Sequence, residues 1–221
     1  MKEIEKFIIK LKHPYVIVFA HKKGGVGKTS TACNVAVEFH KRNYPLSVID
    51  LDSQKQTTKF NNKRKDPFHI EDINNADQLV KFLKADKGLT IIDLGGYDSD
   101  LSRTTLLLAD MVIIPLSDSD NELDGLLEFK KIMVDIQARQ SGIDCNVLVT
   151  RVHHADNSTH KALKGFVESI DGFNIFDTVL RTRKEYKRML GTGKSVTEQT
   201  KGSGSIELLK LIDEIEVKIN G

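Results

Sequence analysis

Short apolar runs recur along the chain and alternate with segments whose apolar residues have helical spacing. Each run is uninterrupted and rich in β-branched side chains, as strands are when helices cover both faces of a parallel sheet. The runs lie at residues 15–20, 46–50, 89–93, 111–115 and 146–151, and shorter strands are expected at 68–70 and 173–176. This alternation predicts an α/β fold with a mostly parallel central sheet flanked by helices.

Helical spacing predicts helices over residues 31–39, 75–84, 121–138 and 205–220. The last of these is expected to place one apolar stripe against the domain, formed by Ile206, Leu209, Ile212 and Ile215. A further short helix is expected within residues 1–12, with one apolar face formed by Ile4, Phe7, Ile8 and Leu11. We expect this N-terminal helix to pack on the domain, with binding to a membrane surface as the alternative.

A glycine-rich turn, K-G-G-V-G-K-T-S at residues 23–30, joins the first strand to the first helix. Glycines let the backbone wrap an anion closely, and the positive end of the helix faces that anion. Lys28 is placed to reach the outer phosphates of a nucleotide, and the Thr29 hydroxyl can bind Mg²⁺. The alternative is a glycine turn that carries two surface lysines. The position between strand and helix favours a polyphosphate site.

Acidic residues stand at the ends of two other strands. Asp50 ends the second strand, Asp52 follows it, and Asp93 ends the fourth. Ligands of open parallel sheets gather at the carboxyl ends of strands, so we expect these acids to face the same crevice as the glycine-rich turn. Asp93 would then hold Mg²⁺ through its water shell. A merely polar strand end is the alternative for Asp50 and Asp52.

Composition adds little beyond this. The chain has 221 residues, of which 39% are hydrophobic and 29% charged, as in an ordinary globular domain, and its net charge of +2 argues for no particular partner. Cys33 and Cys145 are expected to be packed thiols. His153, His154 and His160 are interpreted as surface residues because no cysteine or carboxylate cluster completes a metal site.

Three stretches are unbalanced in charge. Residues 55–65 contain five basic residues and no acid, which alone is typical of a solvated helix face. Residues 110–128 contain six acids and no base, and they form either a solvated face or a docking surface for a basic partner tail. Residues 181–201 contain seven bases and two acids, which suits phosphate neutralisation or a solvated helix.

Three of these motifs together resemble the ParA/MinD family of deviant Walker-type P-loop ATPases. The turn fits K-G-G-x-G-K-[ST] with the additional lysine Lys23, and residues 50–54 resemble the D-x-D-P-Q switch, with Ser53 replacing its proline. Residues 181–196 resemble the R-x-R-x-x-Y … G-x-S-V stretch of ParA proteins. The family more often has proline after the aspartate that corresponds to Asp93, so Gly95-Gly96 is a departure, which leaves open how that loop closes.

The resemblance implies a three-layer P-loop NTPase fold, with residues 1–221 as one domain, an N-terminal extension at 1–14 and ATP and Mg²⁺ as cofactors. Implied ATP-binding residues are Lys23, Gly24, Gly25, Val26, Gly27, Lys28, Thr29 and Ser30, with Thr150 and Arg151 as candidates for base contact. Implied catalytic residues are Lys23, Lys28 and Asp52, and implied metal ligands are Thr29 and Asp93. Implied DNA-binding residues are Arg181, Arg183, Lys184, Lys187 and Arg188.

By this resemblance the protein is expected to be a small ParA-type ATPase of plasmid or chromosome segregation, acting on the nucleoid in the cytoplasm. It would form an ATP-dependent homodimer in which Lys23 serves the partner's nucleotide. The dimer would bind DNA without sequence preference and hydrolyse ATP when a centromere-binding, ParB-like protein stimulates it. Stable membrane association is not expected, because helix 205–220 lacks a basic anchor. A MinD-like ATPase, a positioning adaptor for a conjugation complex and an ATP-dependent synthetase stay open as alternatives.

Overall fold

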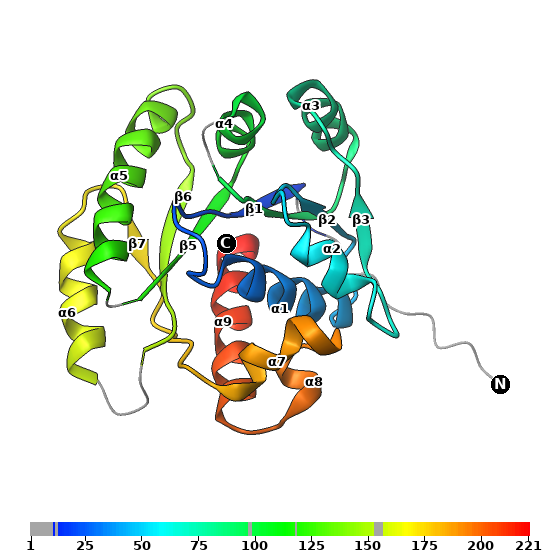
Figure 1. Ribbon diagram of the computed structural model, residues 1–221. Coiled ribbons are helices and arrows are strands. Elements are labelled where there is room, and N and C mark those ends of the chain that lie inside the picture. Colours follow the sequence, from blue (N-terminus) through cyan, green and yellow to red (C-terminus); the bar gives the residue numbers. More distant parts are fainter. Residues whose placement is uncertain (1–10, 12, 97–98, 118, 153–156) are drawn as a thin grey trace.

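A single parallel sheet organises the part of the chain that the computed structural model describes, namely residues 11, 13–96, 99–117, 119–152 and 157–221. Its seven strands lie in the order β3-β2-β4-β1-β5-β6-β7, and every pairing between them is parallel (Figure 1). The strands are β1 (Tyr15–Phe19), β2 (Leu46–Asp50), β3 (His69–Glu71), β4 (Leu89–Asp93), β5 (Met111–Leu116), β6 (Asp144–Val149) and β7 (Asn174–Ile175). The predicted parallel sheet is confirmed.

Helices cover both faces of the sheet, which makes the fold three-layered as expected (Figure 1). One layer holds α1 (Lys28–Lys41), α2 (Gln56–Asn61), α7 (Lys184–Thr192), α8 (Val196–Gln199) and α9 (Ser203–Asn220). The other holds α3 (Ala76–Ala85), α4 (Asp100–Leu107), α5 (Asp120–Gln137) and α6 (Asn157–Glu168). Each layer has its own hydrophobic core, because alternate residues of a strand point to opposite faces. Thus Val16 and Val18 of β1 join one core, and Ile17 and Phe19 join the other.

The register of the central strands brings three strand ends into one row. Phe19 at the end of β1 pairs with Asp93 at the end of β4, and Asp93 pairs in turn with Asp50 at the end of β2. The segment after β1 therefore emerges beside the acids that follow β2 and β4. This row lies at the carboxyl edge of the sheet, where the sequence predicts the site.

Most predicted elements differ from the structure by only one or two residues at their ends. The first helix, predicted from residue 31, begins three residues earlier at Lys28 because the glycine-rich turn leads directly into it. No helix was predicted at α4, α6 or the short α8, and α2 and α7 were considered only as possible solvated helices of the basic stretches. The start of α4 is marked by Ser99, whose side chain accepts from the Ser102 backbone N–H, a local cap without a long apolar repeat. The predicted N-terminal helix lies outside the described residues apart from Leu11, which packs against the core.

The C-terminal helix α9 packs on the domain as predicted, but by a different stripe. Its buried apolar residues are Leu208, Leu211, Ile212, Ile215 and Ile219. Ile206 and Leu209 were assigned to this stripe, and that assignment is wrong, because their side chains are 53% and 37% exposed. Full burial of a large aliphatic side chain contributes about 1.5–3 kcal/mol, so five buried residues hold the helix on the body of the protein. Within the described residues, no helix is both long and apolar enough to cross a membrane.

Candidate nucleotide site

The glycine-rich turn forms a closed loop at the end of β1. Gly25 and Gly27 have φ angles of +78° and +103°, which favour glycine because a side chain would be strained there. Lys28 folds back across the loop, and its Nζ donates to the backbone carbonyl of Lys23 at 3.0 Å. With only 5% of Lys28 exposed, its ammonium group lies inside the loop. This is the geometry that a phosphate-binding loop requires.

Two carboxylates act on this buried ammonium group. Burial lowers the pKa of Lys28, and the charges of Asp93 and Asp52 oppose that shift. Both acids therefore lie within electrostatic reach of Lys28, although they follow different strands. The sequence predicts that these groups share one crevice, and the structure brings them together there.

Asp93 is fully buried at the end of β4. Its Oδ2 accepts from the Thr57 hydroxyl at 2.7 Å, whereas Oδ1 is buried and has no hydrogen-bond partner. Burial raises the pKa of Asp93 from 3.8 to about 6, and the nearby Thr57 and Thr29 hydroxyls oppose this rise. A buried carboxylate oxygen without a partner, next to the Thr29 hydroxyl, suits an oxygen-preferring cation such as Mg²⁺.

We expect the substitution Asp93→Asn to stabilise the free protein at neutral pH. The raised pKa means that the native state binds more protons than the unfolded chain between about pH 4 and 6, so Asp93 reduces stability as the pH rises through this window. Above pH 6 the cost is on the order of 3 kcal/mol, and the neutral amide of the variant carries no charge to bury. Urea unfolding of both proteins without nucleotide or metal, at pH 4.5 and 7.5, measures the difference. An advantage of the variant that does not grow with pH would contradict this account.

The acids after β2 divide their roles. The Asp50 carboxylate accepts from the backbone N–H and the hydroxyl of Thr58 at 2.8 and 2.9 Å, so it holds the first turn of α2. Asp52 accepts from the Gln54 backbone N–H at 2.7 Å through Oδ1. Gly95 presses against Asp52, because a Cβ at position 95 would lie 2.8 Å from the Asp52 Cα atom. Gly95 thus lets the two loops meet closely.

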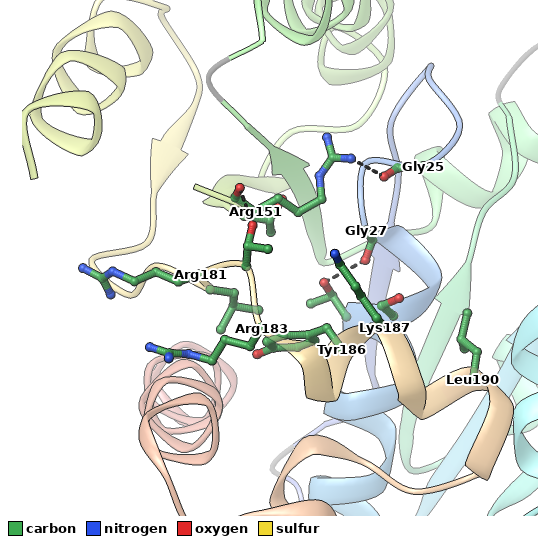
Figure 2. Close-up of a pocket in the computed structure, with 13 residues that line it drawn as sticks. Gly25, Gly27, Arg151, Arg181, Arg183, Tyr186, Lys187 and Leu190 are labelled. Carbon is green, nitrogen blue, oxygen red and sulfur yellow. Dashed lines mark hydrogen bonds between the residues drawn. The ribbon is translucent and has the colours of Figure 1, made fainter. Parts of the chain in front are cut away.

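A pocket of about 330 Å³ opens beside the loop (Figure 2). Its walls come from the glycine-rich loop, the start of α1, the end of β6 and α7, through residues Gly25, Gly27, Ser30, Thr31, Thr150, Arg151, Leu180, Arg181, Thr182, Arg183, Tyr186, Lys187 and Leu190. Thr150 donates to the Val26 carbonyl at 3.1 Å, and Arg151 donates to the Gly25 carbonyl at 2.7 Å. Both candidates for base contact therefore line this pocket, and their contact with a base stays a prediction.

The sequence did not reveal what holds Arg151 in place. The Arg151 guanidinium pairs with the buried carboxylate of Glu122 on α5, which also accepts from the Ser117 backbone N–H at 2.7 Å. Glu128, two turns further along α5, pairs with Lys22. Two acids of the stretch 110–128, Glu122 and Glu128, are thus paired with basic residues of the pocket and the loop. A docking role for the whole stretch is weakened accordingly.

The additional lysine, Lys23, is half-buried between the loop and α5. Its backbone N–H donates to His21 Nδ1 at 3.0 Å, and both the His21 ring and the Lys23 stem lie against Gly125. A Cβ at position 125 would lie 3.1 Å from His21 Cε1. Burial first, and then the charge of Lys28, lowers the pKa of His21 to about 4, so the ring is neutral at physiological pH.

The predicted DNA-binding residues fall into three groups. Arg181 and Arg183 both bind Glu207 of α9, at 3.2 and 2.6 Å, and line the pocket. Lys187 also lines it and extends from α7 toward Gly27 (Figure 2). Lys184 and Arg188 are exposed on α7. Of the five predicted DNA-binding residues, only Lys184 and Arg188 neither line the pocket nor pair with an acid of the described part of the chain.

The remaining sequence assignments concern cysteines and histidines. Cys33 and Cys145 are buried free thiols as predicted, and burial raises the pKa of both. His153 and His154 lie outside the described residues, as does the side chain of His160. Among the described residues no group of three or more His, Cys, Asp or Glu could hold a metal ion. A Mg²⁺ ion bound with substrate phosphates needs only one or two protein ligands, so Thr29 and Asp93 still suit it.

Comparison with known proteins decides the family. A family model described as the CobQ/CobB/MinD/ParA nucleotide binding domain matches residues 17–196. The chain belongs to this family. Family membership agrees with the parallel sheet and with the phosphate-binding geometry of the loop at residues 23–30.

The individual relatives have low sequence identity to this chain. The chain is 30% identical to the protein ParA of Rhizobium radiobacter over 106 residues, which are 46% of this chain and 48% of that protein. A variant of McdA from Cyanothece in complex with ATP has a TM-score of 0.74 and 19% identity, over 93% of this chain and 97% of that one. Cobyrinic acid a,c-diamide synthase of Mycobacterium smegmatis with ADP and magnesium has a TM-score of 0.70 and 16% identity, over 92% and 94%. These two structures share the fold.

Proposed function

We propose that the protein is a Mg²⁺-dependent ATPase of the ParA type that acts in DNA segregation. The observation that carries this proposal is the buried Lys28 ammonium, enclosed by a glycine-rich loop and within reach of both Asp52 and Asp93. Phosphoryl transfer depends mainly on positioning and charge stabilisation, and these residues supply both. The ATP and ADP complexes of the two structural neighbours support the choice of nucleotide, and the ParA relative supports the ParA type.

Each residue of the site has a distinct task in this proposal. Thr29 and Asp93 hold the Mg²⁺ ion, which neutralises charge on the phosphates when it is bound. Lys28 exchanges its bond to the Lys23 carbonyl for the outer phosphates of ATP. Asp52 accepts a hydrogen bond from the attacking water and orients it toward the last phosphate. Thr150 and Arg151 shape the wall of the pocket that receives the base.

Lys23 is proposed to act on a second subunit. Two protomers would meet face to face on ATP, and the Lys23 ammonium of each would then stabilise the nucleotide of the other. Lys23 belongs to the phosphate-binding loop and is only half-buried, which supports this assignment. Hydrolysis would follow stimulation by a centromere-binding, ParB-like protein and would separate the dimer.

The dimer would bind DNA through exposed cations of α7. Because Lys184 and Arg188 contact phosphates in this proposal, we expect Lys184→Glu/Arg188→Glu to weaken DNA binding with ATP and to reduce the slope of log K against log salt by about 2. ATP affinity should not change, since neither residue lines the pocket. Lys187→Gln, one position from Arg188, should instead weaken ATP binding. Fluorescence anisotropy with labelled DNA and labelled ATP, over a range of salt concentrations, measures both.

The matched control for these variants is Lys81→Glu/Lys84→Glu. Both lysines are exposed on α3, in the opposite helical layer, and the change in net charge is the same. Equal loss of DNA binding in this control would show that net charge alone is responsible. Unchanged DNA binding in the α7 variant would show that the surface lies elsewhere.

A positioning ATPase of the MinD kind is the second candidate. Ile206 and Val217 are 53% and 73% exposed on α9, so this helix presents some apolar surface to solvent. Lys210 and Asp213 interrupt that surface, which favours the first candidate. Flotation with anionic lipid vesicles in the presence of ATP distinguishes the two, since only the MinD-like protein would float.

A further inference from the structure

A second basic segment lies beside α7 on the same side of the sheet. The stretch from Lys55 to Lys65, with five basic residues and no acid, covers α2 and the loop that follows it. From the sequence alone it is typical of a solvated helix face. In the structure α2 packs against α7, and both belong to one helical layer (Figure 1). Two basic stretches that are distant in sequence therefore form neighbouring parts of one surface.

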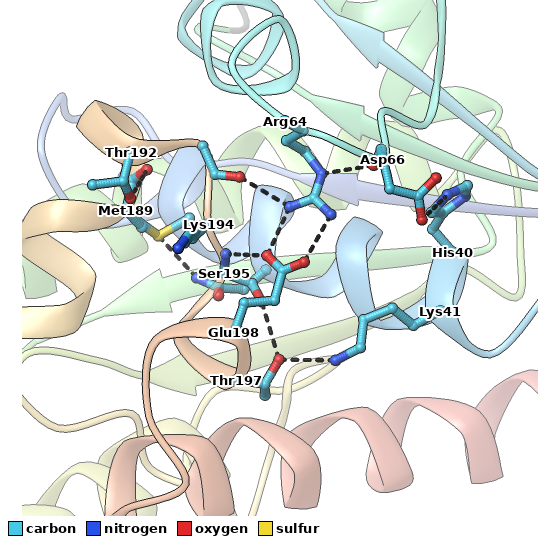
Figure 3. A network of polar contacts seen from close by, with 12 residues as sticks. His40, Lys41, Arg64, Asp66, Met189, Thr192, Lys194, Ser195, Thr197 and Glu198 are labelled. Atoms are coloured by element: carbon cyan, nitrogen blue, oxygen red, sulfur yellow. Dashed lines mark hydrogen bonds and ion pairs between the residues drawn. The ribbon is translucent and has the colours of Figure 1, made fainter.

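Specific hydrogen bonds join the two segments (Figure 3). Lys63 Nζ donates to the Leu190 carbonyl at 2.9 Å, and Arg64 donates to the Gly193 carbonyl at 3.1 Å. Arg64 also binds Glu198 with two hydrogen bonds of 2.9 and 3.1 Å. Gly193 has a φ angle of +68°, and a Cβ there would lie 2.7 Å from the Lys63 backbone. The end of α2 and the end of α7 are thus held in backbone contact.

The charges on this joint surface are not cancelled. Glu198 neutralises Arg64, whose side chain is only 2% exposed. Lys59, Lys63 and Lys65 are exposed, and among the described residues none of them pairs with an acid. The bond of Lys63 to a carbonyl leaves its charge uncompensated. Asp66, the first acid after the stretch, lies 3.3 Å from His40.

The other end of α2 is anchored at the nucleotide site. Thr57 and Thr58 in its first turn donate to Asp93 and Asp50. Because α2 is held at both ends, Lys59 is presented from a fixed helix. Lys65 follows in the loop, next to Lys63 and Arg64, whose side chains bind the end of α7. A preorganised set of cations binds a rigid polyanion with a smaller loss of conformational entropy.

We infer that α2, its following loop and α7 form one composite surface for the phosphates of duplex DNA. In it Lys59 and Lys65 extend the contact made by Lys184 and Arg188. This inference rests on the proposed function and adds a part of the DNA contact that the ParA-like motif at residues 181–196 does not contain. Cations without base-reading side chains between them suit contact with the backbone and not with base edges.

The test compares Lys59→Gln/Lys65→Gln with the wild-type protein and with Lys81→Gln/Lys84→Gln on α3. Affinity for a labelled duplex is measured with ATP across salt concentrations. We expect the α2 variant to lose about tenfold in affinity at physiological salt and its log–log salt slope to fall by about 2, one for each lost phosphate contact. The α3 control should bind as the wild type does. Basal ATP hydrolysis without DNA should be the same in all three proteins.

The possible results separate the two proposals. Wild-type protein that binds DNA, together with an α2 variant of unchanged affinity and slope, overturns the composite surface and leaves the proposed function standing. Wild-type protein that does not bind DNA under any nucleotide condition overturns both. An α2 variant that loses DNA binding and basal ATP hydrolysis together also overturns the inference, because the effect would then arise at the nucleotide site.

Discussion

Lys23→Ala should abolish ATP-dependent dimerisation and lower the rate of ATP hydrolysis on the order of 10³-fold, the lower end of the effect of a charge supplied in trans in other NTPases. ATP binding should change little. The reason is that Lys23 makes its hydrogen bonds within the loop through its backbone, whose N–H donates to His21 and whose carbonyl accepts from Lys28. Alanine keeps both bonds and removes the ammonium group together with the stem that lies against Gly125.

Lys22→Ala is the matched control for this variant. Lys22 is the neighbouring residue, and it is exposed and paired with Glu128. An exposed pair of this kind contributes at most about 1 kcal/mol, so turnover should be close to that of the wild type. Analytical ultracentrifugation and single-turnover hydrolysis measure dimerisation and rate. Normal turnover by Lys23→Ala would show that the second lysine has no catalytic role, and loss of ATP affinity would place it on its own subunit's nucleotide.

Mixing two inactive variants gives a direct test of action in trans. A subunit with Lys23→Ala keeps its own Asp52, and a subunit with Asp52→Asn keeps its own Lys23. In a mixed dimer the second subunit can supply its lysine to the first, which restores one complete site. Partial recovery of hydrolysis on mixing supports the proposal, and no recovery despite mixed-dimer formation contradicts it.

Asp52→Asn should lower hydrolysis at least on the order of 10²-fold while ATP-bound dimers accumulate, because general bases and water-orienting groups contribute about this much. Asparagine keeps the oxygen that caps the Gln54 backbone N–H, so the turn is preserved. Ser53→Ala, at an exposed neighbouring position, serves as the control. Accumulation is measured by gel filtration with ATP, and rate by phosphate release. A freely cycling variant would exclude the water-orienting role.

Gly95→Ala tests the position of the Asp52 carboxylate without changing Asp52 itself. The added methyl group would lie 2.8 Å from the Asp52 Cα atom and 3.0 Å from its Oδ2, so one of the two loops must shift. We expect a loss of rate similar in direction to that of Asp52→Asn, although the carboxylate is retained. This would show that the position of Asp52, and not only its charge, matters for hydrolysis.

The sequence alone was sufficient to predict features that depend on residues close together along the chain. Uninterrupted apolar runs and helical repeats encode which faces are buried, so the parallel sheet and its two helical layers were predicted from them. The loop at residues 23–30 and the position of Asp93 at a strand end also follow from local spacing. Short α4 was missed because its N-cap at Ser99 is a weak signal compared with a long apolar repeat.

Features that join distant segments were decided only by the tertiary structure. Nothing in the local pattern distinguishes Glu122, which holds Arg151, from the other acids of its stretch. Arg181 and Arg183 looked like free cations because their partner Glu207 lies more than twenty residues away. The same holds for Lys63 and Arg64, which meet α7 and Glu198 only after folding. Local sequence determines backbone conformation and burial, whereas the pairing of a charge depends on which helices pack together.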